Sequence, residues 1–155
     1  MAINLTNIRL SRELARLQSD NLDDIISVVP INDYCWHAKI KGPVNTPFEN
    51  GVFDIQLTFD SDYPIKAPSV KFLTPMFHPN IYRDGKICID ILQSKEWTPA
   101  LNVRTILMSI ISLLMDPNPA SPANRDAAEL YKNDKITYES RVKDFIKTNT
   151  TNTKK

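Results

Sequence analysis

The sequence predicts a single α+β domain in which one helix comes first, a run of strands follows, and further helices close the chain. Three observations support this prediction. Apolar residues recur with a helical period near the N-terminus, alternate with polar residues between positions 34 and 59, and return to a helical period after position 102. The chain has 155 residues, 42% of them hydrophobic, which is enough for one buried core and short for two.

The predicted first helix is amphipathic. At about 100° per residue, three leucines share one face and three arginines share another, and the two faces are centred about 130° apart. The leucines are Leu10, Leu14 and Leu17, and the arginines are Arg9, Arg12 and Arg16. We therefore expect the leucines to pack on the core and the arginines to form a basic outer face.

The middle of the chain is typical of antiparallel strands. Every second residue is apolar in two segments, through Tyr34, Trp36, Ala38 and Ile40, and again through Phe53, Ile55, Leu57 and Phe59. A third strand is expected at SVKFL, residues 69–73. The turn sequences GPVNTP and ENG fall between these segments, which indicates a meander rather than strand–helix–strand crossovers.

An irregular segment follows, from about residue 75 to Asn102. Long loops in compact domains are commonly functional, so we expect the functional site here. The next helix has an apolar face made of Val103, Ile106, Leu107, Ile110, Ile111 and Leu114. Its opposite face carries Met108 and Ser112.

The sequence DPNPASPAN, with three prolines, is expected to end that helix. Two shorter helices are predicted at about 123–133 and 135–147. The final residues TNTTNTKK are polar and are expected to fray. We therefore predict one domain over residues 1–148 and a short disordered tail at 149–155.

Composition argues against several classes of partner. The 19 basic and 18 acidic residues leave a net charge of +1, so no overall field favours a nucleic acid or an anionic membrane. We expect a cytoplasmic or nuclear protein, because MAINLTNIRL lacks the pattern of a secretory signal and no apolar run approaches a membrane span. Two distant cysteines in a chain of this size favour reduced thiols over a disulfide.

Cys88 lies just after a turn in HPNIYRDGKICIDIL, residues 78–92, and several roles are open to it. A metal site is disfavoured, because Cys35, His37, His78 and Cys88 lack the paired close spacings of structural zinc. A thiol hydrolase would need His78 as its base, and a buried structural thiol is the commonest role of a free cysteine. With three glycines and no phosphate-binding loop, the chain is not expected to bind ATP.

Acyl transfer is a further role, and it needs no base beside Cys88. Exchange between two thiols is nearly isoenergetic, and a few per cent of thiolate suffices at neutral pH. Transfer to an amine is harder, since a lysine with a pKa near 10.4 is only about 0.04% neutral at pH 7. A site that orients and desolvates the amine would help, and Asp90, Asn80 and Tyr82 supply the acid, amide and aromatic ring.

Several motifs of this chain resemble those of ubiquitin-conjugating enzymes. They are HPN at 78–80, GxICxDIL at 85–92, WTPAL at 97–101, DPNP at 116–119, YPIKAP at 63–68 and GPVNTPFENGVF at 42–53. The resemblance covers about residues 5–148 in the family's order. It implies the UBC fold: an N-terminal helix, a four-stranded antiparallel meander, an active-site segment, a central crossover helix and two C-terminal helices. SPAN, AAELYK and YESRV resemble, more weakly, the branch associated with DNA repair and histone ubiquitination.

The resemblance implies a role for each residue near Cys88. Cys88 would receive ubiquitin from the activating enzyme as a thioester and pass it to a substrate lysine, usually with a ligase of the RING or HECT type. Asn80 would stabilise the oxyanion or hold the active-site loop, and a purely structural turn is the alternative. Asp90 would help position the lysine, unless it is only a solvated acid, and Tyr82 would lie beside the lysine. His78 would be structural.

One position departs from the family pattern. Many members have an aspartate in the loop after DPNP, where this chain has Ser121. Serine carries no charge, so lysine activation would depend more on Asp90, or on phosphorylation of Ser121, which precedes Pro122 and would suit a proline-directed kinase. Lys95 and Glu96 lie where many members have one residue fewer.

Partner surfaces are also implied. Arg9 and Arg12 would contact the activating enzyme, although a solvated face would explain them too. A ligase surface would overlap them at Ile65, Lys66, Pro99 and Ala100, and donor ubiquitin would contact Met108 and Ser112. The family's second ubiquitin site, near Ile25 here, is not predicted. We expect a monomer with no bound cofactor, ATP being consumed upstream by the activating enzyme, and no nucleic-acid or membrane partner.

Two rival functions stay within the same fold. The chain could conjugate another modifier such as SUMO or NEDD8, but Asp90 and the net charge of +1 favour ubiquitin. It could also be a non-catalytic variant that only binds ubiquitin, but such variants lack the nucleophile, so Cys88 argues against this.

Overall fold

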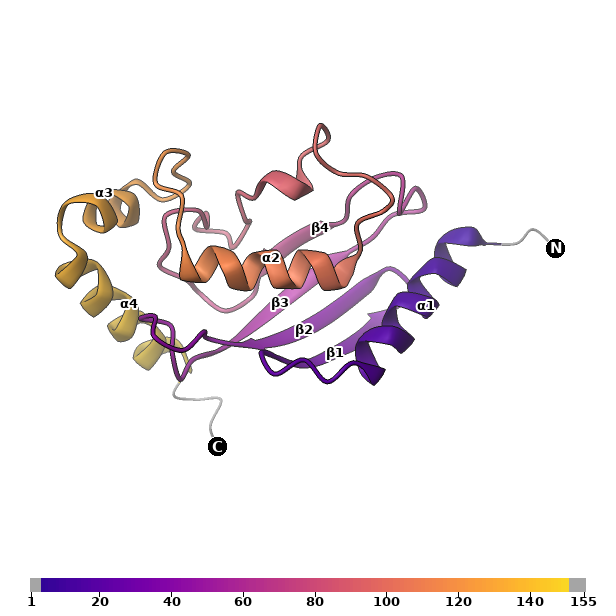
Figure 1. Cartoon of the computed structure of the whole chain (residues 1–155), viewed down its shortest axis with the longest axis horizontal. Coiled ribbons are helices and arrows are strands. Elements are labelled where there is room, and N and C mark those ends of the chain that lie inside the picture. The colour runs from indigo at the N-terminus through magenta and orange to yellow at the C-terminus, as the bar shows by residue number, and fades with distance from the viewer. Residues whose placement is uncertain (1–3, 151–155) are drawn as a thin grey trace.

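The computed structural model describes residues 4–150 and shows four α-helices, one 3-10 helix and a four-stranded sheet within them (Figure 1). The elements are α1 (Leu5–Ser19), β1 (Ile25–Asn32), β2 (Cys35–Lys41), β3 (Val52–Thr58), β4 (Ser69–Phe72), the 3-10 helix η1 (Asp90–Leu92), α2 (Val103–Met115), α3 (Arg125–Asn133) and α4 (Lys135–Thr150). The strands pair antiparallel in the order β1-β2-β3-β4. The predicted α+β meander is confirmed.

The two central strands confirm the period-two pattern. Trp36 pairs with Leu57, Ala38 with Ile55, and Ile40 with Phe53, and all six side chains are buried on one face of the sheet. The intervening residues face the other way, where Lys39 forms an exposed ion pair with Asp54 at 3.3 Å. Alternation is retained because one face of the pleat packs on the core and the other meets water.

Helix α2 crosses one face of the sheet (Figure 1). Its N-cap is Asn102, whose side chain accepts a 2.9 Å hydrogen bond from the amide of Thr105. The six apolar residues predicted for its inner face are all buried, whereas Met108 and Ser112 are exposed. Because one stripe of the helix is apolar, α2 closes the core over β2 and β3 and leaves the other stripe exposed to solvent.

Helices α3 and α4 lie at the opposite end of the molecule from α1 (Figure 1). Helix α4 extends to Thr150, beyond the predicted end at residue 147 and into the predicted tail. No helix breaker occurs before that point, and Asn149 donates a 2.8 Å hydrogen bond to the carbonyl of Phe145, which packs on the core. Residues 151–155 of the predicted tail lie outside the described residues.

Within residues 4–150, no helix combines the length and the apolar character needed to cross a membrane.

Candidate active site

A tight turn precedes Cys88 and fixes its position against the sheet. Gly85 donates from its amide to the carbonyl of Tyr82 at 2.9 Å, and Tyr82 donates to the carbonyl of Lys86 at 2.9 Å. The φ of Gly85 is +94°, and a Cβ there would lie 2.1 Å from the carbonyl oxygen of Phe72 on β4. Only glycine allows both this backbone conformation and this close approach, so Gly85 lets the segment dock on β4.

Cys88 follows this turn and is half-buried at the edge of a shallow groove of about 300 Å³. Its amide donates a 2.8 Å hydrogen bond to the carbonyl of Asn80, which holds the backbone of the two segments together. The groove is also lined by Asp90 from η1, by Asp116 at the end of α2, and by Ser112. A cysteine and two acidic residues therefore line the same groove, which is open to solvent.

The loop after α2, residues 116–124, which we call the gate loop, is held by the side chain of Asn80. The Oδ1 atom of Asn80 accepts from the amide of Asn118 at 2.8 Å. Its Nδ2 atom donates to the carbonyl of Asn118 at 2.7 Å and to the carbonyl of Ser121 at 3.0 Å. An amide nitrogen has two hydrogens, and both are used here. In this arrangement Asn80 holds the loop and has no hydrogen left for an oxyanion.

The preceding residue holds the other end of the gate loop. The carbonyl of Pro79 accepts from the amide of Ala123 at 2.8 Å and from that of Asn124 at 3.0 Å. Two successive residues, Pro79 and Asn80, thus fix the gate loop, and Asn80 also fixes the backbone of Cys88. The backbone of Cys88 and the gate loop are therefore both held by the same two adjacent residues.

His78 is fully buried, and both of its ring nitrogens are occupied. Nδ1 accepts from the amide of Asn80 at 2.9 Å, so the proton lies on Nε2, which donates to the carbonyl of Leu113 at 2.8 Å. Burial lowers the pKa of His78 to about 4, because the imidazolium would be cut off from water. His78 is a neutral structural residue, and the thiol hydrolase interpretation, which needed it beside Cys88, is wrong.

The remaining predicted residues divide into two groups. Asp90 lines the groove with Cys88, whereas Tyr82 and Ser121 are exposed nearby and do not belong to its described lining. Asp116, which the sequence reasoning missed, does line the groove. Its only sequence signal is its place in DPNP, directly after α2. Among the described residues, no group of three His, Cys, Asp or Glu side chains could hold a metal ion.

Comparison with known proteins agrees with this geometry. The family model "Ubiquitin-conjugating enzyme" matches residues 9–146. The chain belongs to the ubiquitin-conjugating enzyme family. It is 51% identical over 139 residues to the "Ubiquitin-conjugating enzyme E2 2" of Candida glabrata, covering 89% of this chain and 83% of that protein. The proteins of the same name in Saccharomyces cerevisiae and Yarrowia lipolytica are 50% and 48% identical, over 89% of this chain and 80% and 91% of theirs.

The predicted function is therefore confirmed: the protein is a ubiquitin-conjugating enzyme, a transferase that acts through a thioester intermediate. Its partners in this pathway are ubiquitin, an activating enzyme and ubiquitin ligases. The relatives' shared name favours ubiquitin over another modifier, as predicted from Asp90 and the net charge.

In this ubiquitin-conjugating enzyme, Arg9 is not simply solvated, which was the alternative to its predicted contact with the activating enzyme. Its Nε atom binds Glu13 at 2.7 Å, and its Nη2 atom donates to the carbonyls of Pro99 and Leu101 at 2.9 and 2.8 Å. Glu13 also accepts from the hydroxyl of Tyr63 at 2.5 Å. Burial, and then the carboxylate of Glu13, raise the pKa of Tyr63 above its usual range, so the phenol stays protonated.

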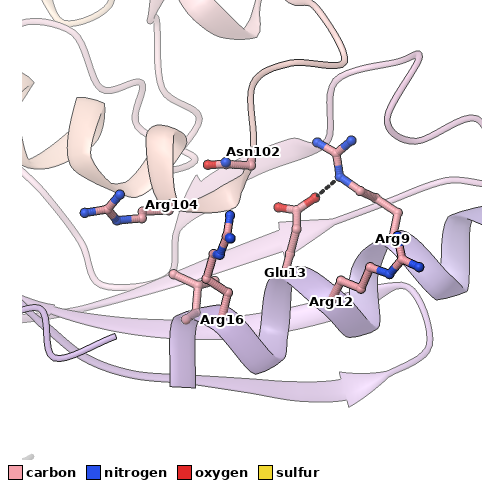
Figure 2. A pocket seen from close by; sticks show the side chains of 7 residues that line it. Arg9, Arg12, Glu13, Arg16, Asn102 and Arg104 are labelled. Carbon is pink, nitrogen blue, oxygen red and sulfur yellow. Dashed lines mark hydrogen bonds and ion pairs between the residues drawn. The ribbon is translucent and has the colours of Figure 1, made fainter. Parts of the chain in front are cut away.

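Figure 2 shows what remains of the basic face beside this cluster. Arg12 and Arg16 of α1 line a pocket of about 390 Å³ with Asn102, the N-cap of α2, and Arg104 of α2. The paired residues Arg9 and Glu13 line it as well. The Nε atom of Arg104 lies 3.8 Å from the Oδ2 atom of Asp20, and this long ion pair is partly exposed. The cationic surface of this end is therefore carried by Arg12, Arg16 and Arg104 rather than by Arg9.

The predicted ligase residues lie on two loops beside the N-terminal half of α1. The indole nitrogen of Trp97 donates to the carbonyl of Pro64 at 2.8 Å, which joins the two loops. Ile65, at the tip of one loop, is 75% exposed, and Pro99 and Ala100 are exposed on the other. The sequence-distant residues therefore lie on adjoining loops and leave an apolar tip facing solvent.

Proposed function

We propose that Cys88 is the residue that carries ubiquitin and that transfer to lysine takes place in the groove beside it. One observation supports this proposal most strongly: Cys88 lines a solvent-open groove with Asp90 and Asp116. Cys35, the other cysteine, lies on β2 and pairs with Thr58, away from the gate loop. Both cysteines are free thiols.

In the first step, the Cys88 thiolate attacks the carbonyl carbon of ubiquitin's C-terminus, held as a thioester on the activating enzyme. A new carbon–sulfur bond forms to Cys88, and the bond to the activating enzyme's cysteine breaks. That cysteine leaves as a thiolate, so the charge balances without a base. The neutral, buried His78 takes no part in the exchange.

In the second step, a substrate lysine attacks the thioester carbonyl. The lysine ammonium first gives one proton to solvent; the neutral amine then forms the carbon–nitrogen bond and loses a second proton to solvent, and Cys88 leaves as a thiolate. Asp90 and Asp116 attract the lysine ammonium into the groove and orient it before it loses its proton. Asn80 acts by holding the gate loop.

Tyr82 and Ser121 act at the rim of the site. The exposed ring of Tyr82 contacts the aliphatic part of the incoming lysine. Ser121 carries no charge, so Asp90 and Asp116 supply the negative potential, and phosphorylation of Ser121 would add about −1.5 to −2 charges beside them.

Partner contacts follow the exposed surfaces. Donor ubiquitin packs on Met108 and Ser112 of α2, and the activating enzyme binds Arg12 and the α1 end held by Arg9. Ligases of the RING or HECT type bind the loops that carry Ile65, Lys66, Pro99 and Ala100. The enzyme acts as a monomer in the cytoplasm or nucleus and binds no cofactor of its own.

Charging with ubiquitin tests the role of Cys88. The protein is incubated with activating enzyme, ATP and ubiquitin, and adducts are separated with and without reducing agent. The parent and Cys35→Ala should form an adduct that a thiol removes, Cys88→Ser should form a more stable ester, and Cys88→Ala should form none. A thiol-labile adduct on Cys88→Ala would overturn the assignment.

Discharge of the charged enzyme onto free lysine tests the groove. Replacing both carboxylates, as Asp90→Asn with Asp116→Asn, should slow discharge about tenfold while charging is unchanged, because two modest attractions are lost. Asp23→Asn, an exposed acid before β1, is the matched control. Equal discharge by the double variant and the parent would show that the carboxylates do not act on lysine.

A further inference from the structure

Beyond the groove at Cys88 and the pocket beside Arg12, the structure has a further cavity, of about 450 Å³, at the other end of the gate loop, where Ala123 and Asn124 line it. Three arginines from three different segments line it: Arg83 from the turn before Cys88, Arg125 from the start of α3, and Arg141 from α4. One acid, Asp126, lines it as well. The cavity, which we call the arginine cavity, therefore has an excess of two positive charges.

Two of the three guanidinium groups are free to bind a ligand. Arg83 and Arg125 are exposed, and neither forms an ion pair within residues 4–150. Asp84, the acid next to Arg83, instead accepts a 3.0 Å hydrogen bond from the amide of Lys86. Unpaired guanidinium groups that line one hollow are suited to carboxylates, which they can bind through two parallel hydrogen bonds.

Apolar side chains also line the cavity. Met76, Phe77 and Phe145 take part in its lining, and the guanidinium of Arg141 lies 4.6 Å from the centre of the Phe77 ring. This contact holds Arg141 in place, so that the third arginine is preorganised. A ligand with a charged group and a neighbouring apolar group fits such a lining better than a uniformly charged polymer.

The arginine cavity lies close to the site of transfer. The amide of Asn124, which also lines the cavity, binds the carbonyl of Pro79, and the next residue, Asn80, binds the amide of Cys88. Two hydrogen bonds and one residue of chain separate the amides of Cys88 and Asn124, a distance on the order of 10 Å. An extended peptide spans that distance with about three residues.

The cavity is also separate from the surface assigned to the activating enzyme. It is built on α3 and α4, at the end of the molecule opposite α1 (Figure 1). Changes in the cavity should therefore leave charging with ubiquitin intact, which allows its function to be measured alone.

We propose that the arginine cavity binds an acidic segment of the protein substrate and so selects lysines that have carboxylates about three to six residues away. This inference rests on the proposed transfer at Cys88. Arg83 and Arg125 bind the carboxylates, and a neighbouring apolar side chain contacts Phe145 and Met76. A protein is favoured over a nucleic acid for two reasons. Asp126 would repel phosphates, and the apolar lining would leave some phosphates of a continuous row without a partner.

Single-turnover discharge onto peptides tests the proposal. The charged enzyme is mixed with peptides that hold one lysine and two glutamates about four or five residues away on either side, or glutamines in their place. At least one acidic peptide should be modified about tenfold faster than its glutamine counterpart. The preference should shrink as salt rises from about 50 to about 300 mM, because partly exposed ion pairs are screened.

Paired variants identify the residues responsible. Arg83→Gln with Arg125→Gln should remove the preference, while charging and discharge onto free lysine stay at the parent level. Lys132→Gln with Lys143→Gln removes the same charge from exposed positions on α3 and α4 outside the cavity lining, and it should keep the preference.

Three results would overturn the inference. The parent could discharge at equal rates onto the acidic and the glutamine peptides, the double arginine variant could keep the preference for acidic peptides, or the double lysine variant could lose that preference as fully as the arginine variant does. Arginine-dependent binding of a short DNA duplex without any preference among peptides would instead assign the cavity to nucleic acid. Failure of the proposed transfer itself is distinguishable, because the parent would then form no Cys88 thioester.

Discussion

Replacing Asn80 with alanine separates two ways in which this residue could assist transfer. The side chain is 1% exposed and makes three hydrogen bonds to the gate loop, two through Asn118 and one through Ser121. If Asn80 acts by holding the loop, its loss should loosen residues 118–121. If it acts on the oxyanion, the loop should stay in place and only the reaction should slow.

The size of the effect follows from the hydrogen bonds lost. Each contributes about 0.5–1.5 kcal/mol net, so the three together hold the loop by about 3 kcal/mol. Since 1.4 kcal/mol corresponds to a factor of ten, the amide of Asn118, which donates to Asn80 at 2.8 Å, should exchange with solvent about 100-fold faster in Asn80→Ala. Discharge onto lysine should slow as well, because the gate loop forms one side of the site.

Amide hydrogen exchange of the uncharged protein and single-turnover discharge of the charged protein measure the two quantities. Asn133→Ala is the matched control, since its side chain makes one exposed 3.3 Å hydrogen bond, to Glu129. The reasoning is refuted if Asn80→Ala slows discharge while Asn118 keeps the parent's protection. That result would assign Asn80 to the reacting atoms.

Three further predictions concern stability. The folded pKa of His78, about 4, lies below its ordinary value of 6.5, so the unfolded chain binds the proton more tightly. The stability that neutral His78 contributes is fully present above pH 6.5 and is lost as the pH falls to 4. The free energy of unfolding should therefore fall by about 2–3 kcal/mol between pH 7.5 and 4.5. Urea unfolding at the two pH values should show that the parent loses this much more free energy of unfolding than His78→Gln does. A difference in unfolding free energy between parent and variant that is the same at both pH values would contradict this. Gly85→Ala should destabilise the fold by more than about 2 kcal/mol, because φ is +94° and the new Cβ would lie 2.1 Å from the carbonyl of Phe72; an unchanged melting temperature would count against it. Glu13→Ala should cost about 2–4 kcal/mol, because three buried or partly buried donors lose their acceptor, whereas a cost below about 0.5 kcal/mol would show that water replaces the carboxylate.

The periodicity of apolar residues was most successful for elements that have one face on the core and the other face in solvent. Helix α2 and strands β2 and β3 each bury one face completely, and their apolar positions were read correctly from the sequence. Strand β1 gave no such pattern, because register shifts between Ile25 and Ser27 and between Pro30 and Asn32 break its alternation. The end of α4 was placed too early, since polar residues near a terminus do not distinguish a helix end from a tail.

The sequence by itself pointed to the chemistry: its motifs indicated the ubiquitin-conjugating enzyme family, which is confirmed, and predicted Cys88, Asn80 and Asp90 as site residues. These signals are local: each motif is a short run of neighbouring residues, and the three predicted site residues lie within positions 80–90. Tertiary structure alone decided how they act. Asn80 bonds to residues 38 and 41 positions away, His78 is neutralised by burial against a carbonyl 35 positions away, and Asp116 reaches the groove from the end of α2. Hydrogen-bond partners and desolvation depend on which distant segments pack together, and a local pattern carries no record of that packing.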